Sequence, residues 1–162
     1  ANARLATAIA RSGRRPRAFL IQDYHLYPLP GLLRGSYPDT PILHFTHIPF
    51  PDPPVLRLIP DPWRQTILRG MLGADVVGLQ TPMDVRSFLS CCTEFLDVTV
   101  DSAAGVVHLL DGRCVRVRAY AASVEPRALR RTAAGKWVAV PFCPSGIGTL
   151  LAETPAERMS VT

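Results

Sequence analysis

The sequence of 162 residues has few aromatic side chains, a single lysine and no long apolar run. No apolar stretch approaches the roughly 18 residues that a membrane-spanning helix needs, so we expect no membrane segment. No charged start leads into an apolar run with a cleavage site, so no signal peptide is visible. The hydrophobic share of 48% excludes a disordered chain, because disorder requires low hydrophobicity and high charge. The length favours one domain.

Nucleic-acid binding is not indicated, although the formal net charge is +5. No aromatic residue interleaves the one dense basic cluster, so a base-stacking groove is not predicted. This cluster consists of Arg11, Arg14, Arg15 and Arg17. A solvated loop between a helix and a strand is the simpler interpretation. We therefore expect neither a nucleic acid nor a membrane as a partner.

Several sequence motifs of metal and catalytic sites are missing. No two of the four cysteines form a Cys-x-x-Cys pair, so a zinc knuckle is not supported. There is no Gly-x-Gly-x-x-Gly, no Walker loop and no Gly-x-Ser-x-Gly elbow. His44 and His47 are three residues apart, and on a strand they would point to opposite faces, which disfavours a metal site. The lack of a secretory signal makes a reducing cytoplasm the expected location.

Helical and strand patterns alternate along the chain. Helices are predicted over residues 2–11, from Leu32 and Leu33 to Gly35, over 63–72 and from Pro82 to Leu96, with Thr81 as the N-cap of the last. Strands are predicted over residues 19–21, 41–47 and 75–80, followed by a hairpin over 105–120 that turns at Asp111-Gly112. The proline-rich residues 48–54 are predicted to be irregular. This alternation predicts an α/β fold with a doubly wound, Rossmann-like, mostly parallel sheet.

Polar residues stand where each predicted strand ends, which is the edge where such sheets bind ligands. They are Gln22, Asp23 and His25, then Thr46 and His47, then Gln80 and Thr81. A carboxylate such as Asp23 can accept hydrogen bonds from sugar hydroxyls, and a histidine such as His47 can stabilise developing charge. The alternative for an aspartate after a strand is a helix cap or a turn former.

Three sequence motifs occur in a specific order. They are Gln22-Asp23-Tyr24-His25-Leu26, then His47-Ile48-Pro49-Phe50-Pro51, then Gly73-Ala74-Asp75-Val76-Val77-Gly78-Leu79-Gln80-Thr81. Over residues 1–131 the chain resembles the trehalose-6-phosphate synthase family of retaining glycosyltransferases. The resemblance implies a GT-B fold, in which two Rossmann-like domains face each other across a cleft. This chain would be part of the N-terminal, acceptor-side domain.

The same resemblance implies a reaction and a set of site residues. The reaction is transfer of glucose from UDP-glucose to glucose-6-phosphate with retention of configuration, with no metal and no cofactor. The implied catalytic residues are Asp23 and His47, and these two contact substrate together with Tyr24, His25 and Gln80. The implied partners are a sugar phosphate and a nucleotide sugar. A homo-oligomer is one option for the full-length enzyme, whose oligomeric state the sequence leaves open.

Two alternatives stay open at this point. One is a related pseudo-glycosyltransferase or a glycosyltransferase with another acceptor, and the other is an inactive sugar-phosphate-binding module. Residues 132–162 match no pattern beyond a candidate strand at 136–140, so this segment is unassigned, with a non-native or frame-shifted origin as one hypothesis. The donor-side domain is missing from the pattern, so we expect the isolated chain to be inactive.

Overall fold

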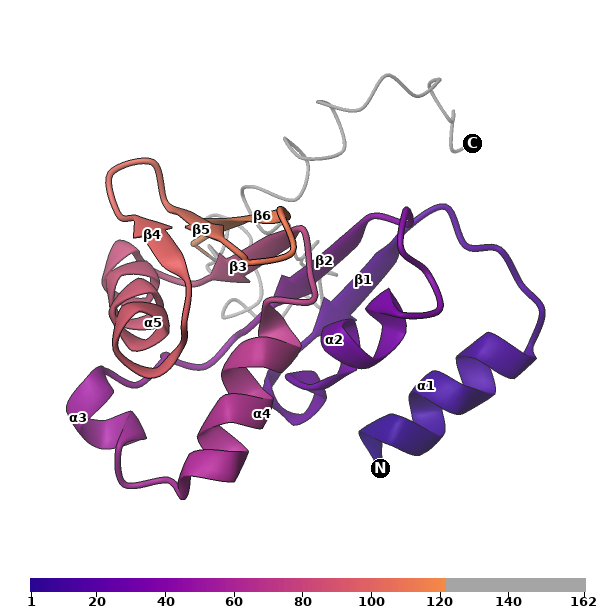
Figure 1. Cartoon of the computed structure of the whole chain (residues 1–162), viewed down its shortest axis with the longest axis horizontal. Helices are drawn as coiled ribbons and strands as arrows, with labels where there is room; N and C mark the ends of the chain where they lie inside the picture. The colour runs from indigo at the N-terminus through magenta and orange to yellow at the C-terminus, as the bar shows by residue number, and fades with distance from the viewer. Residues whose placement is uncertain (122–162) are drawn as a thin grey trace, which may run out of the picture. The chain divides into compact units, whose positions relative to one another are not determined.

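The computed structural model describes residues 1–121, and its compact unit Ala1–Ala119 contains one six-stranded sheet (Figure 1). The strands are β1 (Phe19–Gln22), β2 (Ile42–Phe45), β3 (Val76–Leu79), β4 (Thr99–Asp101), β5 (Val106–His108) and β6 (Cys114–Ala119). The helices are α1 (Asn2–Arg11), the 3-10 helix η1 (Tyr24–Leu26), α2 (Leu29–Arg34), α3 (Pro53–Leu56), α4 (Asp61–Met71) and α5 (Pro82–Phe95). The candidate strand at 136–140 and the predicted boundary at residue 131 lie outside the described residues.

The strand order is β1-β2-β3-β6-β5-β4, and the first four of these strands are parallel. The hairpin β5–β6 and the pair β4–β5 are antiparallel. The predicted α/β fold with a largely parallel sheet is therefore confirmed. Its cause is visible in the sequence, because a helix separates successive parallel strands and a parallel connection needs such a crossover.

One hydrophobic core lies between the sheet and a layer of helices. The strand residues of this core all occupy one face, since Ile21, Val77 and Val117 lie in the same row as His44 across the parallel strands. Helices α1, α2, α4 and α5 supply the buried residues of the other layer, among them Leu33, Met71 and Phe88. Right-handed crossovers that all step in one direction along the sheet place their helices on the same face.

Close approach of α2 to the end of α4 depends on glycine. A Cβ on Gly73 would lie 2.2 Å from the backbone nitrogen of Gly31, and a Cβ on Gly70 would lie 2.5 Å from Cα of Pro28. These neighbours are backbone atoms that cannot rotate away. Only glycine therefore fits at positions 70 and 73, shortly before β3, the strand that ends at the predicted ligand edge.

Proline placement differs from the prediction in two segments. Helix α2 begins at Leu29 rather than at Leu32, and Pro30 lies in its first turn, where no backbone N–H is needed. The predicted irregular stretch 48–54 contains the start of α3, which Asp52 caps by accepting a hydrogen bond from Val55 N. A cap and prolines in the first turn together explain this short helix.

The hairpin and the edge of the sheet also differ from the prediction. The strand ladder ends at His108 opposite Cys114, and the amide of Leu109 still donates to the carbonyl oxygen of Arg113 at 2.9 Å. The loop is therefore the three residues 110–112 and not a two-residue turn. Leu110 in this loop is 81% exposed. Strand β4 was not predicted at all, because its three residues are too short for a visible alternation. Trp63, the first residue of the helix predicted over 63–72, is 69% exposed, and helix α4 begins two residues earlier at Asp61.

The contact of α2 with α4 yields a stability prediction. We expect Gly73→Ala to lower the free energy of unfolding by about 2 kcal/mol, because its methyl group would overlap fixed backbone. Gly35→Ala is the matched control: this residue has helical dihedral angles and open space around it, so we expect a change within about 1 kcal/mol, in the stabilising direction. Urea denaturation followed by circular dichroism measures both; equal effects would contradict the prediction.

Candidate functional site

Backbone hydrogen bonds align the carboxyl ends of β1, β2 and β3. The amide of Asp23 donates to the carbonyl oxygen of Phe45 at 2.7 Å, and the amide of Thr46 donates to the carbonyl oxygen of Gly78 at 3.0 Å. The residues that follow the three strands therefore emerge at one edge of the sheet. This places Gln22 and Asp23, His47 and Gln80 at the edge that the sequence predicted.

The structure brings His47 and Gln22 into direct contact at this edge. His47 Nε2 and Gln22 Oε1 are 3.2 Å apart, and the His47 ring packs edge-on against Phe45 with ring centroids 4.8 Å apart. Both Gln22 and Phe45 belong to the sheet face opposite the helices, whereas His44 belongs to the helix-facing row. His44 and His47 therefore point apart, as predicted. The sequence did not predict the contact with Gln22.

Asp23 has the most unusual backbone of the described chain. It is the only non-glycine residue with positive φ within residues 1–121, at φ 75° and ψ 164°. This region is almost exclusive to glycine, and a side chain there costs roughly 1–3 kcal/mol. Its carboxylate accepts a hydrogen bond from Tyr24 N at 3.0 Å and so caps η1. The capping alternative is thus correct, yet a cap does not require strain, and strain of this kind is typical of functional sites.

Tyr24 and His25 extend this edge toward solvent. Tyr24 is 52% exposed, and its ring stands perpendicular to that of His25 at 5.3 Å. The backbone carbonyl of His25 accepts a hydrogen bond from Asn2 Nδ2 at 3.0 Å, which ties the segment to α1. Both side chains can reach a ligand, but the described contacts of these two aromatic rings are with each other.

A buried polar cluster lies directly beneath the edge. His44 is fully buried, and its Nε2 lies 3.1 Å from Thr46 Oγ1, while its ring contacts Tyr27 with ring centroids 5.4 Å apart. Burial lowers the pKa of His44 to about 4, against a smaller opposite effect of the Asp23 carboxylate. Burial raises the pKa of Tyr27 to about 12. Both groups are therefore neutral at pH 7. Sequence reasoning missed Tyr27 and the role of His44, although residues 44 and 46 on one strand share a face.

Asp84 connects the loop that follows His47 to helix α5. Its Oδ2 accepts hydrogen bonds from the amide and the hydroxyl of Thr81, and its Oδ1 accepts one from the amide of Phe50 at 3.0 Å. Thr81 Oγ1 in turn accepts from the amide of Asp84, which completes a capping box. The predicted N-cap is confirmed. The bond to Phe50, which the sequence did not reveal, holds the proline-rich loop against the end of β3.

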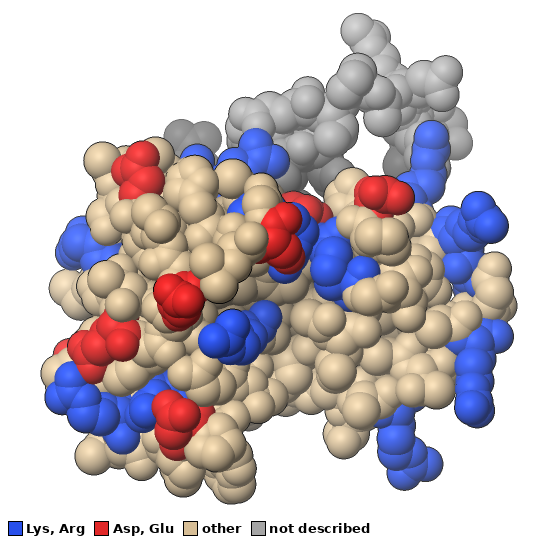
Figure 2. All heavy atoms as spheres, viewed as in Figure 1, with Lys and Arg blue, Asp and Glu red and all other residues tan. Residues whose placement is uncertain are grey.

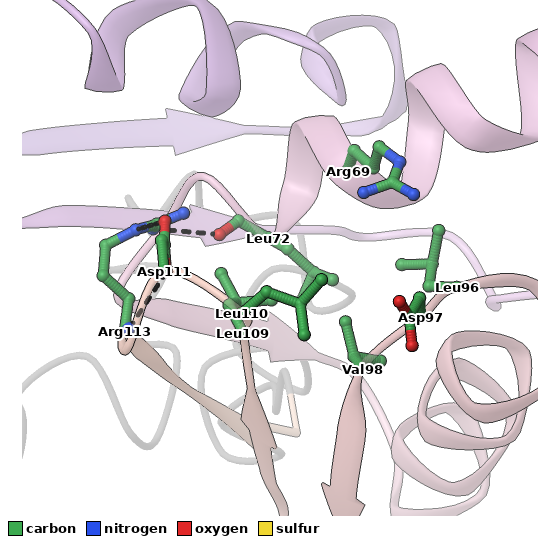
Figure 3. A pocket seen from close by; sticks show the side chains of 9 residues that line it. All are labelled: Arg69, Leu72, Leu96, Asp97, Val98, Leu109, Leu110, Asp111 and Arg113. Atoms are coloured by element: carbon green, nitrogen blue, oxygen red, sulfur yellow. Dashed lines mark hydrogen bonds and ion pairs between the residues drawn. The ribbon is translucent and has the colours of Figure 1, made fainter.

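Other surface features of the described chain lie away from this edge. A cavity of about 240 Å³ has Leu72, Leu109 and Leu110 in its lining, and Arg113 beside it donates to Asp111 and to the carbonyl of Leu72 (Figure 3). It lies where β3 and β6 begin, at the opposite end of these strands. Figure 2 shows basic side chains gathered on the side of α1 and mixed charges elsewhere on that face. The predicted cluster Arg11–Arg17 is exposed, as a solvated loop would be.

Within residues 1–121, no metal-ligand cluster and no membrane-spanning helix is present. No group of three or more histidine, cysteine, aspartate or glutamate side chains there could hold a metal ion. The helices of this part are also too short or too polar to cross a membrane. The predictions of no cofactor and no metal stay predictions.

The fold and the edge residues define a class of protein. This largely parallel α/β sheet, with a strained aspartate, a histidine and a glutamine at its strand ends, belongs to the α/β class in which ligands generally bind at that edge. Within this class, the chain belongs to glycosyltransferase family 20, whose sequence model matches residues 1–140. The match extends nine residues beyond the range that the three motifs indicated.

Similar proteins point to one group of enzymes. The trehalose-6-phosphate synthase of Mycobacterium ulcerans is 38% identical over 140 residues, which cover 82% of this chain and 27% of that protein. A trehalose-phosphate synthase from Burkholderia xenovorans in complex with glucose-6-phosphate has a TM-score of 0.70 and 31% identity, covering 83% of this chain and 30% of that one.

A third similar structure is that of "trehalose-6-phosphate from E. coli bound with UDP-2-fluoro glucose". It has a TM-score of 0.71 and 31% identity, and the match covers 94% of this chain and 32% of that one. The chain therefore spans about a quarter to a third of the length of these relatives. The similarity confirms the predicted family and the GT-B type of fold, while the roles of single residues stay predictions.

The backbone of Asp23 yields a prediction that separates strain from capping. Asp23→Gly and Asp23→Ala both remove the carboxylate that caps η1, but only glycine relieves the positive φ. We expect the glycine variant to be more stable than the alanine variant by roughly 1–2 kcal/mol. Thermal and urea denaturation of the two variants measure this difference, and equal stability would show that Asp23 is not strained.

Burial of His44 yields a pH prediction. Its folded pKa of about 4 lies below the ordinary value of 6.5, so between these values the unfolded chain binds the extra proton. The stabilisation is complete above pH 6.5 and is lost as the pH falls toward 4, with a total of roughly 3 kcal/mol. The free energy of unfolding measured from pH 7 to 4.5 should fall less steeply in His44→Gln than in the wild type; parallel slopes would contradict the assignment.

Proposed function

We propose that residues 1–119 form part of the acceptor side of an enzyme that transfers glucose from UDP-glucose to glucose-6-phosphate with retention. The observation that carries this proposal is the strained Asp23 at the strand edge where His47 contacts Gln22, in a chain of family 20. Relatives that bind glucose-6-phosphate and a UDP-glucose analogue support the two substrates. The whole reaction needs more of the protein than this chain, because the matched relatives are about three times as long.

Charge development during transfer defines what the edge must do. When the bond between the sugar and the diphosphate breaks, the sugar gains positive charge and the leaving diphosphate gains negative charge. Fixed dipoles and charges that match this change supply much of the acceleration, together with correct positioning of the acceptor. A rigid sheet edge is suited to this task, because its groups need not reorganise during the reaction.

Asp23 would orient a sugar by accepting hydrogen bonds from its hydroxyl groups. Its amide is bound to Phe45 and its position on η1 is fixed by its own cap to Tyr24, so the carboxylate is held in one place. A carboxylate hydrogen bond to a hydroxyl is short and strong. The strain of its backbone is the cost of presenting the carboxylate in this direction.

His47 would lie beside the reacting sugars. Its ring is held between the Gln22 amide and the Phe45 ring, and the loop after it is fixed through Phe50 to Asp84. Such a ring can donate a hydrogen bond to a hydroxyl at a defined angle. Further substrate contacts would come from Tyr24, His25 and Gln80, which lie at the same edge. Small molecules would be the partners, in a cytoplasmic enzyme that is a homo-oligomer at full length.

A chimera tests the proposal. Residues 1–119 replace the matching segment of the Mycobacterium ulcerans synthase, and release of UDP is measured with UDP-glucose and glucose-6-phosphate. We expect an active chimera in which Asp23→Asn and His47→Gln each lower kcat by about 100-fold or more. Asp39→Asn and His108→Gln are matched controls, because both residues are exposed and outside the site, and should keep the chimera's rate. The isolated chain should release no UDP.

The remaining outcomes of this experiment are equally informative. Chimera-like rates in both site variants would refute the assignment of Asp23 and His47. UDP release with another acceptor, but not with glucose-6-phosphate, would indicate an enzyme with a changed acceptor. If the chimera does not fold, titration of the isolated chain with glucose-6-phosphate remains, followed by NMR of the histidine ring signals. Shifts of His47 without a shift of His108 would support sugar-phosphate binding, and no shift at millimolar ligand would oppose it.

A further inference from the structure

Cys114 and His108 form a side-chain pair on the hairpin β5–β6. The two residues are directly opposite in the antiparallel register, and Cys114 Sγ lies 3.2 Å from His108 Nδ1. Both side chains are exposed. Cys114 is the first residue of β6, a strand parallel to β1, β2 and β3, so the pair lies toward the opposite end of the sheet from His47 and Asp23. No part of the proposed glucosyl transfer uses this pair.

The groups around the pair come from all three strands of this part of the sheet. Thr99 of β4 is opposite His108 on the other side, and Arg116 follows Cys114 by two residues and therefore shares its face. Asp101 of β4 is opposite Val106, in the same cross-strand row as Arg116 of β6, and its Oδ1 already accepts a hydrogen bond from Ala104 N. Asp111 in the loop is paired with Arg113. Arg116 is exposed, and it is the charged residue of β6 that lies nearest to Cys114 on the same face of the sheet.

The other cysteines of the described chain provide a contrast. Cys91 and Cys92 on α5 are fully buried, and burial raises the pKa of Cys91 to about 12 and raises that of Cys92 as well. Thiols of this kind are protonated and inaccessible, so they react slowly. Cys114 differs in being accessible and in having a base within hydrogen-bond distance.

We propose that Cys114, with His108 as its base, is a thiol-modification site that reacts with the disulfide of an anionic low-molecular-weight thiol. Reaction requires a thiolate, and a histidine within hydrogen-bond distance can accept the thiol proton. Arg116 on the same face provides the charge that attracts an anionic reagent. Paired placement of nucleophile and base on two hydrogen-bonded strands keeps them together without a binding pocket.

The reaction is a balanced thiol–disulfide exchange. The proton of Cys114 moves from Sγ to Nδ1 of His108, and Sγ attacks one sulfur of the reagent R–S–S–R. The reagent's S–S bond breaks while the bond Cys114–S–S–R forms, and the leaving thiolate takes up the proton as R–SH. The protein thiol is oxidised and half of the reagent is reduced, so no further oxidant is needed.

The test is the rate of modification at each cysteine in the folded wild-type chain. Oxidised glutathione is the probe, and peptide mass spectrometry after quenching with acid resolves the single cysteines. We expect Cys114 to be modified at least about tenfold faster than Cys91 and Cys92. His108→Gln should lower the rate at Cys114 about tenfold at pH 7 and only slightly at pH 9.5, where the thiol ionises without help. Similar rates at Cys114 and Cys91 would overturn the proposal.

Matched variants distinguish the role of His108 as a base from the effects of sheet packing and of the charge of Arg116. Thr99→Val changes the same row of the sheet without removing the imidazole and should leave the rate unchanged. Arg116→Gln should lower the rate at which oxidised glutathione modifies Cys114 several-fold, but it should not lower the rate with the neutral 2-hydroxyethyl disulfide. A His108→Gln effect that is equal at both pH values would refute the role of a base. An Arg116→Gln effect that is equal for both reagents would refute the preference for an anion.

Discussion

Two backbone hydrogen bonds at the ends of parallel strands are the constraint on which the candidate site depends. They run from Asp23 to Phe45 and from Thr46 to Gly78, and they bring three separate sequence motifs to one edge. A shift of one residue in either strand pair would turn the following side chains to the other face. The register in turn depends on the core row that contains Ile21, His44 and Val77, which alternation places against the helices.

Polar groups below and beside the edge make it rigid. The cluster of Tyr27, His44 and Thr46 fills the space under the strand ends with neutral, buried groups, while Asp84 fixes the loop of Phe50 to the start of α5. Rigid surroundings are what allow Asp23 to keep a backbone conformation that is otherwise left to glycine. Packing and helix caps thus supply the stability that keeps Asp23 in an unfavourable backbone conformation.

Much of the fold could be predicted from local signals. Thr81, Pro82 and Asp84 mark the start of α5 because each satisfies the helix N-terminus in its own way. The apolar runs before Gln22 and Gln80 mark strands, but only β3 is buried as expected, because β1 lies at the edge of the sheet and leaves Leu20 exposed. The errors have physical causes too. A cap at Asp52 outweighed the expectation that prolines prevent a helix, and the three-residue β4 is formed by pairing with β5 rather than by its own pattern.

The sequence by itself determined the alternation of helices and strands, the family, and the choice of Asp23, His47 and Gln80 as edge residues, since these follow from short-range pattern and motif order. Only the tertiary structure revealed the positive φ of Asp23, the contact of His47 with Gln22, the bond from Asp84 to Phe50 and the pairing of Cys114 with His108. The physical reason is the same in each case. Dihedral strain and hydrogen bonds between residues 6 to 34 positions apart depend on strand register and helix docking, which no local pattern encodes.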